Sequence, residues 1–476
     1  MKIAMVASEA APFIKTGGLG DVMQALPAAL GGIPGAEVTL FLPFYPRIKY
    51  SAEVEREFVE CFTVDLAWRQ AYVGLFRLKS RKRKLKVYFI DNEQYFGHAD
   101  AYGYSDDGER FAYFSKAVLE SMLHLGYTPD VIHCHDWQTA AVPVFLRAFY
   151  QDTLGTAKTV FTIHNIEYQG RADSSFRADV MGLSEEYEST LAFDGGVDLM
   201  KAAILKSDAV TTVSETYARE ILSPGVGHGL DGILREHAFK LRGITNGIDP
   251  SVDPAVDPGL ATPYGVADHA AGKAAAKAAL ARELGLSADP GVPLIAMVTR
   301  LVSHKGMDLL CGVAEELMNW DLRLVILGTG DARYENHLAS VAARHPGRLS
   351  VNLRFDPSLA SRIYAASDLF LMPSKSEPCG LSQLIAMRFG SVPIVHEVGG
   401  LKDTVEPFRQ DLRTGVGFTF QQYSAEDLLD ALRRALTVYA GDKDGFDAAV
   451  QNCMTYDSSW DRPAEKYLAL YRELVG

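Results

Sequence analysis

The sequence predicts an α/β protein built from two doubly wound parallel sheets, and three observations support this fold class. Short apolar runs typical of buried strands alternate along the chain with segments of helix length. Most of these runs lack polar alternation, as expected when helices cover both faces of a sheet. The runs also form two series, separated by a stretch around 249–291 where the composition changes. We therefore expect two Rossmann-like domains that face each other across a deep cleft.

The elements can be assigned in chain order from these runs. In the first half of the chain, strands are expected at 3–7, 38–44, 87–90, 131–134, 159–163 and 209–213. In the second half, strands are expected at 294–298, 322–327, 349–353, 369–372 and 392–395. Helices are expected at 272–284, 307–317 and 460–474, and the last of these has an apolar stripe that includes Tyr467 and Tyr471.

The chain length and a change in composition give the domain boundaries. A chain of 476 residues is too long for one ordinary core. Residues 1–243 are expected to form an N-terminal Rossmann-like domain and residues 244–456 a C-terminal one. Residues 457–476 are expected to form a helix that packs back towards the first domain. The stretch 249–265, rich in proline, aspartate and glycine, lies just after the first boundary.

Composition excludes several classes of protein. The net charge of −13 argues against nucleic acid as a partner, because a phosphate backbone requires a basic face. The basic run at 81–84 lies between two strand-like segments and is interpreted as a hairpin turn. Five scattered cysteines without a C-x-x-C pair indicate neither a zinc site nor a disulfide framework. Because neither a signal peptide nor a membrane-length apolar run is found, a cytoplasmic protein is expected.

A glycine-rich loop follows the first strand-like run. It spans residues 15–22, Lys-Thr-Gly-Gly-Leu-Gly-Asp-Val, and a helix is expected to begin there. Gly17 and Gly18 let the backbone approach a ligand, and a helix start offers unpaired N–H groups. Lys15 adds a positive charge, so an anionic, phosphorylated ligand is expected, while Asp21 would accept hydrogen bonds from hydroxyls or pair with a cation. The spacing fits neither the dinucleotide fingerprint nor the P-loop, and a tight turn without a ligand is the alternative.

Two later strand-like runs also end in polar clusters. The run at 131–134 contains His133 and leads into His135, and the run at 159–163 leads into His164. Neutral histidines can hydrogen-bond a polar ligand, and the aromatic residues that follow both runs suit the C–H face of a sugar. A purely structural role is the alternative. A metal site would need ligands beyond the two histidines at 133 and 135 that the sequence does not identify.

The second half of the chain supplies cations and an acid at similar places. Arg300 follows the run at 294–298, and Lys305 precedes the helix expected at 307–317. Two cations at a helix start suit a diphosphate, whereas a solvated Arg–Lys pair is the alternative. Glu377 lies in a loop after a later strand-like run, next to a proline that favours a helix start.

In this order, these segments resemble the bacterial glycogen synthases, which belong to the starch/glycogen synthase family of retaining glucosyltransferases. The resemblance covers nearly the whole chain. Its most specific motifs are those at 15–22 and the Glu-Pro-Cys-Gly-Leu at 377–381, and the motifs at 245–249 and 459–464 also fit.

The resemblance implies a fold, a reaction and its substrates. The fold would be GT-B, with the acceptor on the N-terminal domain and the nucleotide sugar on the C-terminal one. The enzyme would transfer glucose from ADP-glucose to the non-reducing end of an α-1,4-glucan such as glycogen, with retention of configuration and without a metal or cofactor. No prediction of oligomeric state or allosteric control follows from the motifs.

The resemblance also implies residue roles. Glu377, His135 and Asp21 would be the catalytic residues, orienting the transferring glucose and stabilising charge. The substrate-binding residues would be Lys15, Gly17 and Gly18 in the donor site, Arg300 and Lys305 on the diphosphate, Asn246 on the glucose, Phe355 near the base, and the backbone of Cys379, Gly380 and Leu381 beside the sugar.

Three departures from the family pattern affect substrate detail. Ser376 replaces the usual aromatic before the glutamate, Phe355 replaces a tyrosine, and a typical tryptophan is absent from 251–254. A related GT-B transferase with another donor or acceptor is the main alternative. Many such relatives carry a second glutamate where this chain has Ile385, which favours the synthase. A phosphorylase would need a lysine motif that is not found, and a glucan-binding pseudoenzyme would have lost the charged residues that this chain retains.

Overall fold

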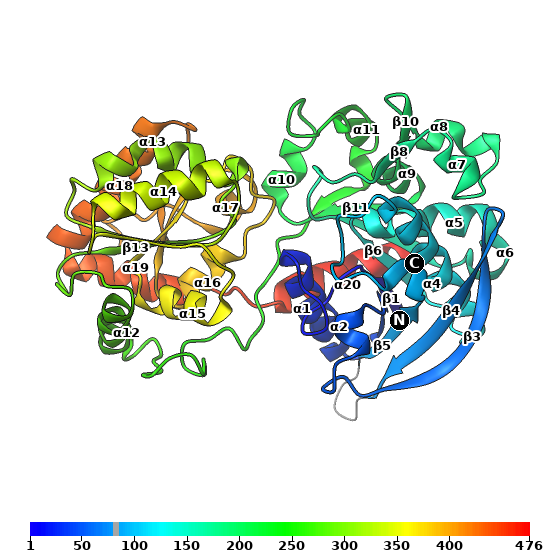
Figure 1. Ribbon diagram of the computed structural model, residues 1–476, viewed down its shortest axis with the longest axis horizontal. Helices are drawn as coiled ribbons and strands as arrows, with labels where there is room; N and C mark the ends of the chain where they lie inside the picture. Colours follow the sequence, from blue (N-terminus) through cyan, green and yellow to red (C-terminus); the bar gives the residue numbers. More distant parts are fainter. Residues whose placement is uncertain (80–84) are drawn as a thin grey trace. The chain divides into compact units, whose positions relative to one another are not determined.

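The computed structural model describes residues 1–79 and 85–476, which divide into two compact units. Unit 1 comprises Met1–Gly247 together with Trp460–Gly476, and unit 2 comprises Ile248–Ser459. The boundaries expected at 243/244 and 456/457 lie a few residues before these. Each unit has its own buried apolar core, and both chain termini lie in unit 1 (Figure 1).

Unit 1 is built on a twisted sheet whose order, among the described residues, is β12-β11-β7-β6-β1-β2-β5-β4-β3. The strands from β12 to β5 in this order pair in parallel. They are β1(Lys2–Val6), β2(Glu37–Pro43), β5(Lys86–Asp91), β6(Val131–His135), β7(Lys158–Ile163), β11(Ala209–Thr212) and β12(Leu241–Gly243).

A long hairpin extends one edge of this sheet. Strands β3(Arg56–Leu66) and β4(Arg69–Leu78) pair antiparallel, and β4 also pairs antiparallel with β5. The antiparallel pairing of the two strand-like segments that flank the basic run is therefore confirmed, but the predicted turn at 81–84 lies outside the described residues. A small antiparallel sheet, β8(Arg171–Asp173), β10(Gly196–Asp198) and β9(Ala192–Phe193), is a separate feature of unit 1.

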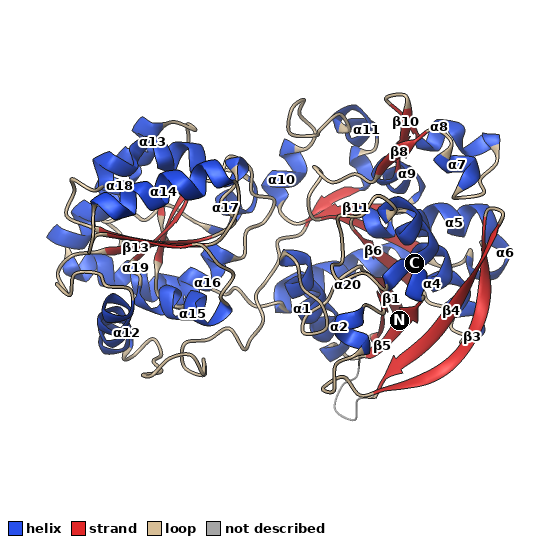
Figure 2. Cartoon of the chain, in the orientation of Figure 1, coloured by secondary structure: helices blue, strands red, loops and turns tan. Residues whose placement is uncertain are grey.

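Helices cover both faces of the large sheet (Figures 1 and 2). Those of unit 1 are α1(Gly18–Gly32), α2(Pro46–Lys49), α3(Glu93–Phe96), α4(Asp107–His124), α5(Ala141–Phe149), α6(Gln151–Leu154), α7(Phe176–Asp179), α8(Glu188–Leu191), α9(Leu199–Lys206), α10(Glu215–Glu220), α11(Asp231–Glu236) and α20(Asp461–Val475), with 3-10 turns η1(Trp137–Thr139), η2(Glu185–Tyr187) and η3(Ala238–Lys240).

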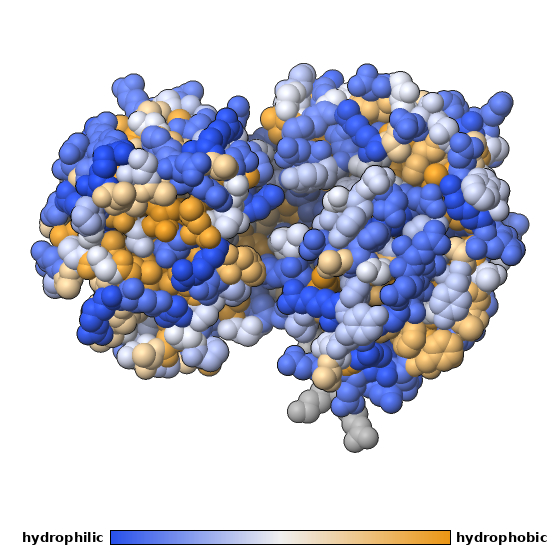
Figure 3. Space-filling view, viewed as in Figure 1, coloured by the Kyte–Doolittle hydropathy of each residue, from blue (hydrophilic) through white to orange (hydrophobic). Residues whose placement is uncertain are grey.

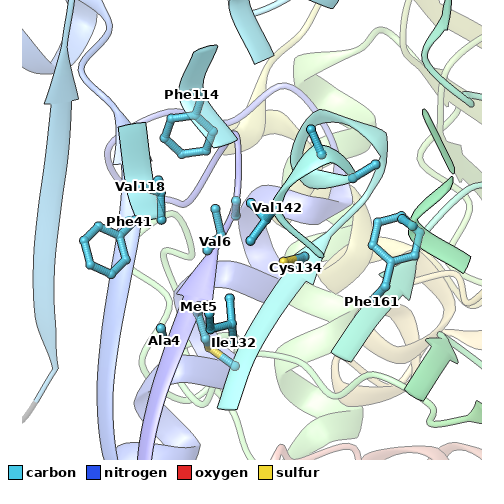
Figure 4. Close-up of a cluster of buried hydrophobic side chains, with 14 of the residues drawn as sticks. Ala4, Met5, Val6, Phe41, Phe114, Val118, Ile132, Cys134, Val142 and Phe161 are labelled. Carbon is cyan, nitrogen blue, oxygen red and sulfur yellow. The ribbon is translucent and has the colours of Figure 1, made fainter. Parts of the chain in front are cut away.

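The core of unit 1 lies between the central strands and these helices. Figure 4 shows Val6 of β1 beside Cys134 of β6, with Phe114 of α4 and Val142 of α5 pointing toward the same region. All four side chains are fully buried, which the continuous apolar strands require. Helix α20 joins the same core through its apolar stripe, which includes the buried Tyr471.

Unit 2 repeats the doubly wound pattern with a parallel sheet in the order β15-β14-β13-β16-β17-β18 among the described residues. Its strands are β13(Leu294–Val298), β14(Arg323–Leu327), β15(Leu349–Asn352), β16(Leu369–Met372), β17(Val392–His396) and β18(Phe418–Phe420). Its helices are α12(His269–Glu283), α13(Met307–Leu317), α14(Ala332–Arg344), α15(Pro357–Ala366), α16(Ser382–Arg388), α17(Gly399–Thr404), α18(Ala425–Gly441) and α19(Lys443–Thr455), with the 3-10 turn η4(Ser303–Lys305).

Each sheet has a point where the strand order reverses. In unit 1, β1 lies between β2 and β6, so the chain winds outward in both directions from the β1/β6 pair. In unit 2, β13 lies between β14 and β16, which makes the β13/β16 pair equivalent. Ligands of such sheets bind beyond the carboxyl ends of the strands at this reversal. The fold therefore directs attention to the loops that follow these four strands.

The surface is largely polar, as the composition predicts. Hydrophilic residues predominate on the face of the molecule drawn in Figure 3. Within the two described stretches of the chain, none of the helices is long and apolar enough to cross a membrane.

Candidate active site

The glycine-rich loop of unit 1 is held in place by a buried acid that sequence reasoning missed. Glu9 accepts hydrogen bonds from the backbone N–H groups of Thr16, at 2.5 Å, and Gly17, at 3.2 Å. Its other carboxylate oxygen accepts a hydrogen bond from the Tyr102 hydroxyl at 3.0 Å. Burial raises the pKa of Glu9, and the two backbone hydrogen bonds partly oppose that rise. Glu9 thus fixes the path of the loop at the carboxyl end of β1.

The protein itself does not require glycine at position 17. Gly17 has an extended backbone with φ −145°, and a Cβ placed on it would meet no atom within 4 Å. Because an alanine would be tolerated sterically in the protein alone, the absence of a side chain keeps open space beside the start of α1. This observation favours the ligand interpretation of the loop over the structural-turn interpretation.

Lys15 and Asp21 lie together in this loop. Their charged groups are 2.7 Å apart, and the two side chains are 42% and 40% exposed. The pairing of Asp21 with a cation, one of the two expectations for that residue, is therefore seen. Exposed pairs of this kind contribute little to stability, so both groups remain available to a ligand.

His133 has a structural role. It is fully buried, and its two ring nitrogens lie 2.7 Å from the Tyr471 hydroxyl and 2.6 Å from the Thr162 hydroxyl. Burial lowers its pKa to about 3, so the ring is neutral near pH 7. Since both nitrogens are hydrogen-bonded, His133 ties α20 to β6 and β7 and has no ring nitrogen left for a ligand.

His135, by contrast, has one free nitrogen. Its Nδ1 atom lies 3.0 Å from Nε2 of His164, while its buried Nε2 atom has no hydrogen-bond partner among the described residues. Burial lowers the pKa of His135 far below its usual value and that of His164 to about 3. Both rings are therefore neutral near pH 7. A neutral ring with a free nitrogen suits hydrogen bonding to a hydroxyl better than it suits proton transfer.

Asp136 positions the second histidine. Its carboxylate accepts a hydrogen bond of 2.7 Å from the backbone N–H of His164, and its own backbone has the left-handed φ of 59°. Burial raises its pKa to about 7. Left-handed backbone is costly for a residue other than glycine, and such strain concentrates at functional sites. The carboxyl ends of β6 and β7 are thus joined by a hydrogen-bonded cluster.

Asn246 also carries an unsatisfied polar atom. It is only 7% exposed, and its buried Oδ1 atom has no hydrogen-bond partner in the part of the chain that the structure describes. An unpaired buried polar atom costs about 1–3 kcal/mol unless a ligand or water satisfies it. Asn246 and His135, two of the predicted sugar contacts, therefore each have a buried polar atom that could hydrogen-bond a hydroxyl group of a ligand.

An open groove of about 400 Å³ begins beside this cluster. Its walls include Trp137, which follows β6, and Tyr168, which follows β7 and is 49% exposed. Gly170 allows the wall to form, because a Cβ at this position, whose φ is +69°, would lie 2.4 Å from the Trp137 ring. The two aromatic residues that follow separate strands in the sequence thus line one groove.

In unit 2, the predicted residues at the β13/β16 reversal form a buried ion pair. The Lys305 ammonium lies 2.6 and 2.8 Å from the two carboxylate oxygens of Glu377. The side chains are 17% and 7% exposed, and Ser374 donates a further hydrogen bond of 3.0 Å to Glu377. The sequence placed Lys305 on a diphosphate and Glu377 on the glucose, but did not predict that the two residues bind each other.

The backbone around Glu377 is closely packed. The Lys375 N–H donates a hydrogen bond of 2.9 Å to the carbonyl of His304, which joins the loop after β16 to η4. The Gly400 N–H donates to the Glu377 carbonyl at 3.1 Å. A Cβ on Gly399, whose φ is +44°, would lie 2.0 Å from that carbonyl oxygen, so only glycine fits there. The loop that carries Glu377 is therefore held against η4 and the start of α17.

The remaining predicted residues of unit 2 lie at the same edge of the sheet. Arg300 follows β13, is exposed, and makes no ion pair among the described residues. Phe355 follows β15 and is 83% exposed. Cys379 is buried, and Gly380 has the left-handed φ of 73° just before Leu381, the residue that precedes α16.

A metal centre has no support in the described part of the chain. Within residues 1–79 and 85–476, no group of three or more histidine, cysteine, aspartate or glutamate side chains is arranged to hold a metal ion. The histidines at 133 and 135, considered as ligands from the sequence, have the other arrangements described above.

Sequence reasoning left Glu9, Asp136 and Ser374 out of the predicted site. Glu9 could have been noticed as a lone acid in the apolar stretch that follows the first strand. Asp136 stands beside a predicted residue, but its contact with the loop after β7 depends on the pairing of two strands. No signal in the sequence identifies Ser374 as a partner of Glu377.

Comparison with known proteins gives a consistent result over the full chain. The family model described as starch synthase catalytic domain matches residues 2–236, and that described as glycosyl transferases group 1 matches residues 285–443. A glycogen synthase of Clostridium beijerinckii is 45% identical over 481 residues, which cover 100% of both chains. A glycogen synthase of Desulfitobacterium hafniense is 46% identical and covers 100% of this chain and 99% of its own.

A solved structure agrees with these matches. The catalytic domain of Starch Synthase IV from Arabidopsis thaliana, bound to ADP and acarbose, superposes with a TM-score of 0.91 at 35% sequence identity, over 99% of each chain. The two parallel, doubly wound units, their loops at the strand reversals and the full-length similarity agree with one another. The chain therefore belongs to the glycogen synthase family and is a glucosyltransferase with the GT-B fold.

Proposed function

We propose that this enzyme transfers glucose from ADP-glucose to the non-reducing end of an α-1,4-glucan, with retention of configuration and without a metal or cofactor. The observation that carries the donor assignment is the full-length similarity to a starch synthase whose structure holds ADP. The groove and free polar atoms of unit 1 support a hydroxylated acceptor.

The charges of unit 2 support a role in binding the donor's diphosphate. Breaking the anomeric C–O bond leaves negative charge on the nucleotide, and a fixed cation would stabilise that charge. Lys305 is already neutralised by Glu377, whereas Arg300 has no carboxylate partner among the described residues. Arg300 therefore supplies the net positive charge, and Lys305 directs its remaining N–H toward the anion. The exposed ring of Phe355 is available to stack on the base.

Glu377 acts in this proposal as an orienting and electrostatic residue. A carboxylate held by Lys305 and Ser374 has little freedom to attack a sugar carbon as a covalent nucleophile. Within this neutral ion pair, its fixed carboxylate oxygens instead form a local negative pole that orients the glucose and stabilises the positive charge developing on the ring as the bond breaks. The backbone of Cys379, Gly380 and Leu381 follows directly and offers N–H donors to the same sugar.

The residues of unit 1 would contact sugar hydroxyls and the donor. His135 and Asn246 each have an unsatisfied buried atom that can hydrogen-bond a hydroxyl. Lys15, Asp21, the open space beside Gly17, and Gly18 at the start of α1 suit a charged, hydroxylated ligand. The groove beside Trp137 would hold the glucan, with ring C–H groups packed on its aromatic walls.

The test is glucose transfer to glycogen with ADP-glucose and UDP-glucose in parallel, using the wild type, Arg300→Ala and Arg409→Ala. Arg409 is an exposed arginine of the same unit that lies outside the predicted site, so it controls for loss of surface charge. We expect transfer from ADP-glucose, a loss of at least about a hundredfold in Arg300→Ala, equivalent to about 3 kcal/mol, and little change in Arg409→Ala.

Each other outcome corrects a particular part of the proposal. Transfer from UDP-glucose alone would overturn the donor, and full activity of Arg300→Ala would overturn the diphosphate assignment. Digestion of the product with an α-1,4-specific glucosidase tests the stereochemistry, because an inverted linkage would resist that enzyme.

A further inference from the structure

Gln383 is a fully buried polar residue in the first turn of α16, and the reaction proposed above gives it no role. Its side-chain amide reaches back to the loop that carries Glu377. The Nε2 atom donates to the carbonyl oxygens of Cys379, at 3.0 Å, and Gly380, at 2.9 Å. It also lies 3.1 Å from the Thr404 hydroxyl. One amide thus binds two consecutive backbone carbonyls beside the predicted sugar contacts.

The surroundings determine which end of the amide faces these groups. The two carbonyl oxygens can only accept hydrogen bonds, and the Thr404 hydroxyl donates its hydrogen to the Gly400 carbonyl at 2.6 Å. All three contacts of the Nε2 atom are therefore acceptors, and a rotated amide would place its oxygen against them. The Gln383 Oε1 atom, on the other side, is buried and has no hydrogen-bond partner among the described residues. The amide consequently has a single favourable orientation.

Gly380 provides the space that this amide occupies. A Cβ on Gly380 would lie 2.3 Å from the Gln383 Oε1 atom, and the φ of Gly380 is +73°. Because the amide is held by three contacts, it cannot move aside without losing hydrogen bonds. Position 380 therefore requires glycine both for its backbone conformation and for the buried side chain three residues later.

The two bonded carbonyls set the direction of the next two N–H groups. Both peptide bonds are trans, and in a planar trans peptide the C=O of one residue and the N–H of the next point in opposite directions. Gln383 holds the carbonyls of Cys379 and Gly380, so the N–H groups of Gly380 and Leu381 point away from the buried amide. The side chain thus controls two backbone donors that it does not touch.

These two N–H groups are available to a ligand. Neither donates a hydrogen bond to another group in the described part of the chain, and both Gly380 and Leu381 are half-buried. Gly380 has a left-handed φ, whereas Leu381 has a right-handed backbone with φ −113° and ψ −29°. Backbone that alternates in this way brings successive N–H groups into one concave site for a negatively polarised atom. An oxygen atom of a ligand fits this description.

We propose that Gln383 is a positioning residue that directs the N–H groups of Gly380 and Leu381 at hydroxyl oxygens of the donor's glucose. The identity of the sugar rests on the proposed function. Gln383 does not itself contact the substrate, because its side chain is fully buried behind the loop. The diphosphate and the base are assigned to other side chains of unit 2. Loss of the amide should therefore weaken recognition of the sugar and leave recognition of the nucleotide unchanged.

The experiment compares the wild type with Gln383→Met, Gln383→Glu and the control Thr404→Val. Gln383→Met keeps the length of the side chain but has no N–H donor. Gln383→Glu keeps its shape but turns carboxylate oxygens toward the two carbonyls, and Gln383→Met carries the test if this buried charge prevents folding. Thr404→Val removes the third acceptor and the bond to Gly400, whose N–H binds the Glu377 carbonyl, but leaves both carbonyl contacts of Gln383 in place.

Three measurements separate the sugar from the nucleotide. Glucose transfer to glycogen gives kcat and KM for ADP-glucose. Isothermal titration calorimetry without glucan gives the Kd for ADP and the Kd for ADP-glucose. Circular dichroism and size-exclusion chromatography report the folding of each variant.

We expect Gln383→Met to lower kcat/KM for ADP-glucose at least about tenfold, equivalent to about 1.4 kcal/mol, while the Kd for ADP stays within about twofold. Gln383→Glu should lose more, because its oxygens repel the two carbonyls, and Thr404→Val should stay within about threefold of the wild type. Unchanged kcat/KM in Gln383→Met would overturn the proposal, and so would an equal weakening of ADP and ADP-glucose. A loss in Thr404→Val as large as that in Gln383→Met would also overturn it, since the effect would then pass through Gly400 to Glu377.

Failure of the proposed function would look different. If the wild type bound ADP-glucose but transferred no glucose, the reaction would be wrong. A raised Kd for ADP-glucose in Gln383→Met, with an unchanged Kd for ADP, would then still support the role of Gln383. If the wild type transferred glucose and Gln383→Met did so equally well, the reaction would stand and the role of Gln383 would not.

Discussion

Replacing Lys305 with methionine should destabilise unit 2 by about 3 kcal/mol as well as remove activity. The substitution keeps the length and apolar character of the side chain but leaves the Glu377 carboxylate, 7% exposed, without its cation. The Ser374 hydroxyl would be the remaining side-chain donor identified for it. Removing one partner of a buried pair costs about 3–5 kcal/mol, and the 17% exposure of Lys305 places this case at the lower end because some water reaches the site.

A double-mutant cycle separates this effect from a general disturbance of the site. Glu377→Gln alone leaves a lysine whose flexible stem can turn the ammonium toward water, so its cost should be smaller. In the double variant Lys305→Met/Glu377→Gln both charges are gone, and the glutamine can still accept from Ser374. The double variant should therefore be more stable than the sum of the single effects predicts, with a coupling energy of at least about 2 kcal/mol.

Native-state hydrogen exchange measured by mass spectrometry is the appropriate assay, because a protein of two units need not unfold in one step. Peptides from β13 and β16 report unit 2, and peptides from β1 and β6 serve as an internal control. A coupling energy below about 0.5 kcal/mol would refute the reasoning, since that value is typical of residues without shared contacts. Activity should be lost in all three variants. If the double variant recovers stability but not activity, the pair both stabilises unit 2 and is needed for glucose transfer.

Three further substitutions test unit 1. Gly17→Ala should change the free energy of unfolding by less than about 0.5 kcal/mol, because the added Cβ meets no atom of the protein. It should nevertheless raise the KM for the donor. Unchanged donor kinetics would mean that no ligand approaches this glycine. Tyr471→Phe should cost about 1–2 kcal/mol in chemical denaturation, because it leaves a buried nitrogen of His133 unpaired, and an unaffected midpoint would contradict that estimate. Because burial raises the pKa of Asp136 to about 7, its contribution to stability is present near pH 4 and is lost as the pH rises through 7. The wild type should therefore lose stability relative to Asp136→Asn, by at most about 4 kcal/mol, between about pH 4 and pH 8; a difference in melting temperature that is constant with pH would contradict this reasoning.

Much of the fold could be predicted because buried parallel strands leave a strong signal. Every strand expected from an apolar run is present, and the helix predicted at 307–317 is α13 with the same bounds. The unpredicted strands lack that signal for physical reasons. β12 and β18 are three-residue edge strands, and β3 is largely exposed, so none of them needs a continuous apolar run.

The candidate site was predictable as a set of strand ends but not as a set of contacts. Residue types showed that Lys305 and Glu377 follow strands, and the order β13-β16 then brings them together although 72 residues separate them in the chain. Nothing in the sequence states that order. The same holds for His135 and His164, which meet because β6 and β7 are neighbours. Pairing across a sheet is a tertiary property, so local patterns can nominate such residues but cannot assign their partners.

The two ion pairs at the strand reversals have opposite consequences for experiment. Lys15 and Asp21 are about two-fifths exposed, so breaking their pair removes little stability, and a loss of activity in Lys15→Ala can be assigned to ligand binding. Glu377 is buried and Lys305 is only 17% exposed, so the same substitution there changes stability and ligand binding together. Because the exposed pair is the one beside the open space at Gly17, it is the better probe of the proposed donor site. The buried pair needs the double-mutant cycle before any loss of rate can be attributed to the transfer step.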